Sequence, residues 1–266
     1  MIKACEKTNI GIFGFGNMGQ AIFKLLAKQA EINFFIYSIG VTKIKRAVCL
    51  KSFEELVGKC DYIFLCLKPQ DFYDLKPAKT NNKVFISIMA GVGINNIKKI
   101  INSRNIVRVM PNLPLQVGQG VIAWYAKDKK FKNQLNFIKK IFTNFGYSFR
   151  VSRESELDKI TAISGSGPAY IFLFMDALIR ASLNLGFKRE QSEQIILQLF
   201  RGSLQYFKDV KKTYTLKSLI KMVKSKKGTT EAALNELNTK KFYQAWQSAI
   251  NQAYRRAKEI SHYEIK

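Results

Sequence analysis

Residues 9–22 read NIGIFGFGNMGQAI. A short apolar run over 10–13 leads into a GxGxxG turn, and a helix-forming stretch follows it directly. In this context the glycines allow a tight turn and a close approach of the backbone to a pyrophosphate, and the helix start offers free N–H groups to the anion. The alternative is a glycine-rich turn with a packing role only. We predict a dinucleotide-binding loop made of Gly14, Phe15, Gly16, Asn17, Met18 and Gly19.

Apolar runs and amphipathic stretches alternate over roughly the first 150 residues. Runs that are apolar throughout are typical of strands buried on both faces, and their alternation with helices indicates a parallel, doubly wound sheet. The predicted strands are 10–13, 33–37, 62–67, 84–88, 106–110, 120–124 and 147–151, and the predicted helices between them are 18–29, 52–58 and 95–102.

Beyond residue 151 the strand pattern stops and apolar residues recur with helical spacing. The predicted helices are 154–186, 189–210, 215–224, 229–237 and 242–260. The expected fold class is therefore α/β followed by all-α. A Rossmann dinucleotide-binding domain would cover 1–152, and a helical domain would cover 153–266.

The composition limits the chemistry. The 266 residues include one His, His262, so a His-based triad or a multi-His metal site is nearly excluded, and we predict no metal. None of the four Cys forms a C-x-x-C pair, which indicates neither a zinc site nor a disulfide framework and favours a reducing compartment. These are Cys5, Cys49, Cys60 and Cys66.

A membrane-spanning segment is not predicted. The longest uncharged run, ITAISGSGPAYIFLFM at 160–175, has 16 residues, fewer than the roughly 18–20 that a bilayer requires. Lys and Glu interrupt the first nine residues, so we expect no signal peptide. We interpret the run as a buried core helix of a cytoplasmic protein.

The formal net charge of +25 raises nucleic acid as a partner. Residues 207–227 hold eight Lys against one acid, Asp209, but only Phe207 and Tyr214 could stack on bases. A salt-sensitive, non-specific affinity is the most that this pattern predicts. We expect no specific nucleic-acid partner.

The end of the second predicted strand indicates which dinucleotide binds. An acid there would hold the ribose 2′-hydroxyl of NAD, but the strand ends at Ser38, and Lys43, Lys45 and Arg46 follow. A hydroxyl with nearby cations suits the additional phosphate of NADP. The alternative is that these cations lie on a solvated surface.

Three further strand ends break into Gly or Pro, in LCLKPQ (65–70), SIMAGV (87–92) and RVMPNLP (108–114). Ligands of open α/β sheets bind at the carboxyl ends of the strands. Together with SGSGPAY (164–170) and the Gly-Thr-Thr of KSKKGTTEAALNEL (224–237), these motifs resemble the pyrroline-5-carboxylate reductase family over nearly the whole chain.

The resemblance implies an enzyme that uses NADPH, or NADH, to reduce L-1-pyrroline-5-carboxylate to L-proline. It implies that the helical domain interlocks with a second copy, giving a homodimer or a larger homo-oligomer. It implies cofactor contacts from Cys66, Leu67, Lys68, Pro69, Ile88, Met89, Ala90 and Asn112, and substrate contacts from Glu154, Ser225, Gly228, Thr229 and Thr230.

The chemistry requires no His, because the hydride comes from the nicotinamide. A helix starting at Gly228 would offer N–H groups to the substrate carboxylate, and the Thr230 hydroxyl would donate to the imine nitrogen. The residues alone leave an alternative open for each site. In one, Thr229 or Thr230 is only the N-cap of the helix; in the other, Glu154 is only a solvated acid. Lys226 and Lys227 replace a Pro and a Gly of the family's loop.

Two rival functions remain. A β-hydroxyacid dehydrogenase would need a Lys with a nearby Asn on one helix, whereas Lys159 is followed by Ile, Thr, Ala and Ile. The second rival is a family paralogue with weakened activity. It stays open because Lys227 replaces a Gly of the family's loop, and a Gly in a left-handed conformation is not easily replaced by Lys.

Overall fold

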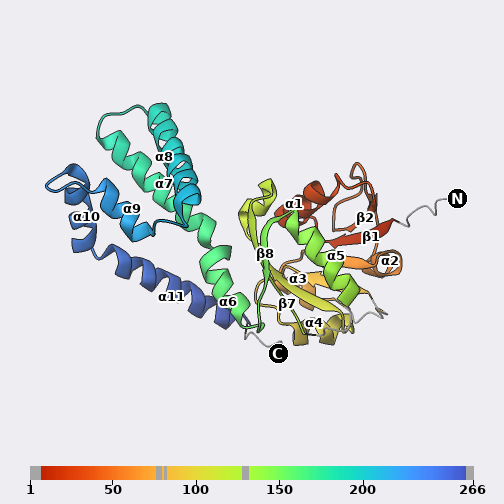
Figure 1. The fold of residues 1–266 in the computed structure, drawn as a ribbon. Helices are drawn as coiled ribbons and strands as arrows, with labels where there is room; N and C mark the ends of the chain where they lie inside the picture. Colours follow the sequence, from red (N-terminus) through yellow and green to blue (C-terminus); the bar gives the residue numbers. More distant parts are fainter. Residues whose placement is uncertain (1–6, 76–79, 81–82, 128–131, 262–266) are drawn as a thin grey trace. The chain divides into compact units, whose positions relative to one another are not determined.

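The structure, a computed structural model, describes residues 7–75, 80, 83–127 and 132–261. The chain forms two compact units, one of Met1–Pro168 with Gln252–Lys266 and one of Ala169–Asn251 (Figure 1). This division differs from the predicted boundary at 152/153, because the helical residues that follow the last strand pack onto the sheet. Leu157, for example, is buried against Ala123 and Val151. Cys5 and His262 lie outside the described residues.

The first unit is built on a sheet that has eight strands within the described residues, in the order β3-β2-β1-β4-β5-β6-β7-β8. All neighbours pair in parallel except β6 and β7, so the predicted all-parallel sheet was wrong at this point. A parallel return needs a crossover of a dozen or more residues, and only a turn with the short 3₁₀ helix Leu113–Val117 joins these strands. The strands are β1 (Thr8–Phe13), β2 (Ile32–Tyr37), β3 (Val48–Cys49), β4 (Tyr62–Leu65), β5 (Val84–Ser87), β6 (Ile106–Met110), β7 (Gly120–Ala126) and β8 (Gly146–Arg150).

Helices cover both faces of the sheet, as the apolar strands require. One core cluster contains Ile22 of α1 and Ile138 of α5 with inward side chains of β1, β2 and β7. The other contains Leu56 of α2, Phe72 of α3 and Ile97 of α4 with side chains of β4 and β5. The helices are α1 (Asn17–Leu26), α2 (Phe53–Lys59), α3 (Pro69–Tyr73), α4 (Ile94–Ile101) and α5 (Lys132–Thr143).

All seven predicted strands exist, with ends shifted by up to two residues. Four elements of the described residues were missed: β3, α3, α5 and the 3₁₀ helix Leu113–Val117. The strand β3 has two residues and α3 has five, too short for a periodicity to show. The helix α5 did carry the signal, because Leu135, Ile138 and Ile141 are buried with helical spacing.

The rest of the chain is helical. A π-helical turn, Thr161–Gly165, separates α6 (Glu156–Ile160) from α7 (Gly167–Asn184). Then come α8 (Arg189–Val210), α9 (Leu216–Val223), α10 (Thr229–Thr239) and α11 (Phe242–Ser261). The last part of α11, from Gln252 on, belongs to the first unit.

The prediction of a buried core helix at 160–175 was wrong for most of that run. No residue of α7 is buried in this chain, although Phe172 and Leu173 are large and apolar. Helical residues Glu156–Asn184 are long and apolar enough to cross a membrane by length and composition. The same composition suits a helix whose apolar side chains pack against another protein surface.

Candidate cofactor pocket and substrate loop

The glycine turn after β1 can be made only by glycine at two positions. Gly14 has φ +90°, and a Cβ there would lie 2.6 Å from the Cys66 carbonyl oxygen. A Cβ on Gly19 would collide with the Gly14 carbonyl oxygen. At Gly16 a Cβ would meet open space, because nothing lies within 4 Å. The turn is therefore closed on its protein side and open on the side where a ligand can approach the backbone.

A pocket of about 290 Å³ opens at this turn, where β1, β2 and β4 end. Ser38 shapes it, because its Oγ accepts a hydrogen bond from the Phe15 N–H at 3.1 Å. Seven predicted cofactor residues line the pocket, namely Gly14, Phe15, Gly16, Ser38, Cys66, Leu67 and Lys68. Sequence reasoning missed Phe13, Tyr37, Ile39, Asp71 and Leu75, most of which are chain neighbours of predicted residues.

The pocket has the properties that a dinucleotide requires. The helix α1 begins with Gly16 as its N-cap and has no side-chain cap there, so the first-turn N–H groups stay available to an anion. The first turn of α1 contains no acid, and no carboxylate stands at the tip of β2. Lys43, Lys45 and Arg46 follow β2 and are exposed. These features fit a pyrophosphate with an additional phosphate on its ribose.

Two predicted cofactor residues have structural partners of their own. The Asn112 Oδ1 accepts the Val121 N–H at 2.8 Å, and the Asn112 Nδ2 donates to the Ser164 carbonyl at 3.2 Å. Asn112 thus connects β6 and β7 to the π-helical turn. Met89 is 3% exposed, and its N–H donates to the Ser87 Oγ at 3.4 Å. Neither residue lines the pocket, and their contact with the cofactor stays a prediction, as does that of Ile88, Ala90 and Pro69.

Burial keeps the thiols of Cys60 and Cys66 protonated at neutral pH. Burial raises the pKa of the Cys66 thiol well above its usual range. Burial, with a smaller contribution from the Asp61 carboxylate, raises the pKa of Cys60 to about 12. Because its pKa is raised, Cys66 presents a neutral thiol beside the pocket. The thiolate, not the thiol, is the reactive form.

Glu154 lies in the first unit, in contact with a buried cation. Its Oε1 accepts the Ile94 N–H at 2.8 Å and pairs with the Arg108 guanidinium at 3.1 Å. Sequence reasoning missed Arg108, although a single cation inside the apolar strand IVRVM signals a buried charge with partners.

The predicted substrate residues of the second unit gather at the start of α10. Gly228 is the N-cap, with Thr229 and Thr230 in the first turn. This excludes the alternative in which either Thr is the N-cap. The Gly228 N–H donates to the Ser225 carbonyl at 3.1 Å, and a Cβ on Gly228 would collide with the Ser225 Oγ. The N–H groups of the first turn point out of the helix start, as in an anion site.

Lys227 holds the left-handed conformation that makes this turn, with φ 59°. Glu231 supports it, because its Oε2 accepts the Lys227 N–H at 2.7 Å and its Oε1 pairs with the Lys224 Nζ at 2.9 Å. The Lys224 ammonium, and then the Lys227 N–H, hold the pKa of Glu231 below its usual value. A Lys therefore takes the left-handed backbone that a Gly would adopt more easily.

Thr230 also lines an apolar groove within the second unit. The groove holds about 570 Å³ and is bounded by α8, α9 and α10. Its other lining residues are Ser203, Tyr206, Phe207, Leu216, Leu219, Ile220, Met222, Val223 and Leu234.

The parallel strands, the glycine turn and the pocket at the strand ends define a Rossmann-type NAD(P)-dependent oxidoreductase. Residues 9–91 match the family described as NADP oxidoreductase, coenzyme F420-dependent, and residues 154–260 match pyrroline-5-carboxylate reductase dimerisation domains. The chain belongs to the pyrroline-5-carboxylate reductase family.

The relatives extend over both units. The pyrroline-5-carboxylate reductase of Staphylococcus aureus is 33% identical over 95% of this chain and 97% of its own, and that of Staphylococcus epidermidis is 32% identical over the same shares. A crystal structure of the Plasmodium falciparum pyrroline carboxylate reductase with NADP bound has a TM-score of 0.85 at 30% identity, covering 97% of this chain and all of that one.

Proposed function

We propose that this protein reduces L-1-pyrroline-5-carboxylate to L-proline, the last step of proline biosynthesis, with NADPH as the preferred hydride donor and NADH as a second. One observation carries the proposal: the similarity to named reductases covers 95% of the chain. It therefore includes both the unit with the dinucleotide pocket and the unit with the anion-binding helix start.

The bound nicotinamide supplies the hydride. The chain's part is to hold the pyrophosphate at the N-terminus of α1 and to keep the glycine turn open to it. Ser38 and the exposed cations Lys43, Lys45 and Arg46 would face the ribose phosphate of NADP. Ile88, Met89, Ala90 and Asn112 would contact the cofactor from the ends of β5 and β6, and Pro69 would do so from the start of α3.

The substrate needs donors at two places. Its carboxylate would accept hydrogen bonds from the first-turn N–H groups of α10, with Ser225, Gly228 and Thr229 shaping the loop. The Thr230 hydroxyl would donate to the imine nitrogen as the hydride arrives. A cyclic imine is basic, so orientation and one hydrogen bond are sufficient and no strong general acid is required.

The prediction that Glu154 contacts the substrate stays a prediction. Its Oε1 is engaged by Arg108 and by the Ile94 N–H, and its side chain is 28% exposed. A substrate contact would therefore use the exposed part of a carboxylate that is already held in place.

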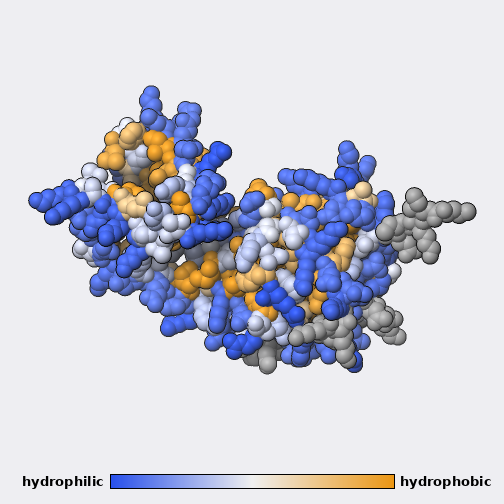
Figure 2. All heavy atoms as spheres, viewed as in Figure 1, coloured by the Kyte–Doolittle hydropathy of each residue, from blue (hydrophilic) through white to orange (hydrophobic). Residues whose placement is uncertain are grey.

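We also propose that the protein is a soluble, cytoplasmic homodimer or larger homo-oligomer with no specific nucleic-acid partner. Figure 2 shows apolar side chains open to solvent over α7 and α8. On these two helices Leu173, Leu197 and Leu204 are each more than half exposed. Surfaces of this kind mark protein–protein contacts, and they coincide with the matched dimerisation domain.

The test is an assay of imine reduction with two variants of one residue. Purified protein is mixed with pyrroline-5-carboxylate and NADPH, or with proline and NADP at high pH, and the absorbance of the reduced nicotinamide is followed. Thr230→Ala should lower kcat about 100-fold, the range typical of one lost transition-state donor. Thr230→Ser keeps the hydroxyl and should retain most activity.

The affinity for NADPH, measured by its fluorescence on binding, should be equal in all three proteins. No turnover in either direction would reject the reductase function. Equal activity of Thr230→Ala and the wild type would reject Thr230 as the donor while leaving the function intact.

A further inference from the structure

A buried cation lies in the middle of β6. Arg108 stands between Val107 and Val109 in a strand that faces the core, and its side chain is only 7% exposed. A guanidinium cannot stay in such a place without charged partners, because its desolvation would otherwise destabilise the fold. Its partners therefore show which other segments it holds.

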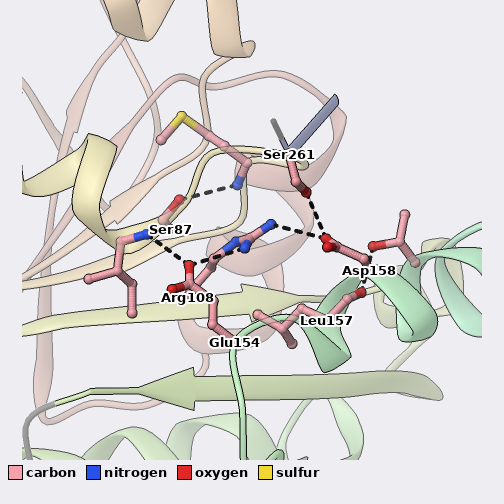
Figure 3. A network of polar contacts seen from close by, with 9 residues as sticks. Ser87, Arg108, Glu154, Leu157, Asp158 and Ser261 are labelled. Carbon is pink, nitrogen blue, oxygen red and sulfur yellow. Dashed lines mark hydrogen bonds and ion pairs between the residues drawn. The ribbon is translucent and has the colours of Figure 1, made fainter. Parts of the chain in front are cut away.

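Two carboxylates from the segment after β8 are those partners (Figure 3). Glu154 Oε1 lies 3.1 Å from one terminal nitrogen of Arg108, and Asp158 Oδ1 lies 3.7 Å from the other. Asp158 is itself 7% exposed. One cation faces two anions, so the group retains a negative charge that further donors must balance.

Those donors come from two distant elements. The Ile94 N–H, at the first residue of α4, donates to Glu154 at 2.8 Å. The Ser261 hydroxyl, in the last turn of α11, donates to Asp158 at 2.7 Å. Figure 3 shows the Ser261 hydroxyl bonded to Asp158, with Glu154 and Asp158 on either side of Arg108. We call Arg108, Glu154, Asp158 and Ser261 the latch.

Glu154 fixes the end of the segment that follows β5. The N-cap of α4 is Gly93, which has no side chain to cap the helix, and Glu154 places a carboxylate there instead. An anion at a helix N-terminus is favourable because it complements the helix dipole. Residues 88–93 are thus held at the carboxyl end of β5, the edge where ligands of such sheets bind.

The end of α11 packs against the same segment. Gly91 has φ +75°, and a Cβ there would collide with the Ile260 side chain and lie 3.0 Å from the Ile260 backbone. Ala257 of α11 is also buried, at 7% exposure. Residues 88–93 are therefore bounded by the start of α4 on one side and by the last turn of α11 on the other.

We propose that Arg108 and Ser261 are positioning residues of the cofactor site, which hold residues 88–93 through Glu154, Asp158 and the end of α11. The inference rests on the proposed function, in which Ile88, Met89 and Ala90 contact the cofactor. Its consequence is a coupling: NADPH binding and the docking of residues 252–261 stabilise each other, because both need one arrangement of residues 88–93.

The experiment measures that coupling in the full-length protein. Hydrogen exchange of residues 252–261 and the dissociation constant of NADPH are measured for the wild type, for Ser261→Ala and for Ser248→Ala. Ser248 is an exposed serine on the same helix and is the matched control. Arg108→Lys is added because it keeps the buried positive charge but has only one nitrogen in place of the two that pair with Glu154 and Asp158.

NADPH should slow exchange of residues 252–261 in the wild type and in Ser248→Ala. Ser261→Ala should raise the dissociation constant at least about fivefold, the low end of typical coupling between sites, and should lose most of the NADPH-dependent protection. Arg108→Lys should weaken both effects without abolishing them.

The result differs if the latch only stabilises the fold and has no effect on NADPH binding. Exchange of 252–261 would then rise in Ser261→Ala by the same amount with and without NADPH, at an unchanged dissociation constant, and this overturns the proposal. The readouts do not require turnover. Wild-type protein that binds NADPH but does not reduce the imine would reject the proposed reaction and leave the coupling measurable.

Discussion

Lys227 shows how one residue can depart from an expected pattern without destroying the local structure. It adopts φ 59°, a left-handed conformation that is disfavoured for residues other than Gly, Asn and Asp. Its N–H is held by Glu231 at 2.7 Å. The hydrogen bond to Glu231 thus maintains this conformation, and part of its stabilising free energy offsets the strain of the left-handed backbone.

Lys227→Gly should therefore raise the free energy of unfolding. Removing a left-handed Lys gains about 1–2 kcal/mol, and the entropy of a new Gly offsets about 0.5–1 kcal/mol of it, so the expected net gain is about 0.5–1 kcal/mol. Urea unfolding at a fixed protein concentration measures the change. Lys226→Gly is the control, because Lys226 does not have a positive φ, and it should destabilise. Equal effects of the two variants would contradict the strain argument.

At the residue scale, the sequence predicted what depends on local geometry. Gly14, Gly16 and Gly19 could be assigned because a turn of that kind needs glycine at fixed spacing. The partners of Arg108 could not be, because Glu154 and Asp158 lie 46 and 50 residues further along the chain. Only the fold brings them to β6, and a cation in an apolar strand reveals a partnership without naming the partner.

At the scale of the element, α10 owes its start to Glu231. This residue sits in the first turn and bonds back to the N–H of Lys227, one residue before the N-cap, whereas a capping-box Glu would bond to the N–H of the N-cap itself. The N-cap Gly228 leaves the first-turn N–H groups uncovered for a ligand. The cap and the proposed anion site therefore share one helix end.

Glu231→Gln should destabilise the loop by its full amount above the unfolded pKa of a Glu, and the effect should shrink as pH falls through the lower pKa of the folded protein. The pKa of Glu231 is lowered in the folded protein, so its contribution is fully present above the unfolded pKa of roughly 4.3 and is lost as pH falls through the folded pKa. Thermal midpoints from pH 7 to about pH 3.5 measure the gap between variant and wild type, which should close on acidification.

The control for this prediction is Glu236→Gln. Glu236 is on the same helix and pairs with Lys240 at 3.7 Å on the exposed surface, where such pairs contribute little. Its thermal midpoint should follow the wild type at every pH. A gap for Glu231→Gln that stays constant across this range would show that the carboxylate charge is not what holds the loop.

Element prediction succeeded where periodicity alone decides and failed where context decides. The strand β6 was predicted with the correct bounds, and so was α8. The predicted parallel direction of β7 was wrong, because a pattern of apolar residues carries no information on strand direction. The short connection between β6 and β7 does carry that information. The burial of 160–175 was wrong, because apolar composition cannot distinguish a core helix from one that packs on another surface.

At the scale of the molecule, the two units differ in how they satisfy their apolar residues. The sheet unit buries its large side chains in two clusters, one on each face. The helical unit buries few: α8 has only Ser192 and Ile196 buried, and α7, α9 and α10 have none. The proposed association with a second copy would cover these helices, and exposed apolar patches of this kind are rare on monomers.

Leu173→Glu should therefore convert the oligomer into monomer. Leu173 is 64% exposed on α7, and a two-fold interface contains each substitution twice. Losing about 1.5 kcal/mol of burial at each copy raises the dissociation constant by at least ~100-fold, before the cost of burying two carboxylates. Asn184→Glu introduces the same charge at an exposed polar position of α7 and should leave the oligomer intact. Light scattering coupled to size exclusion, over a concentration series, measures the molar mass of both variants. An unchanged mass for Leu173→Glu would place the interface on another face of the helical unit.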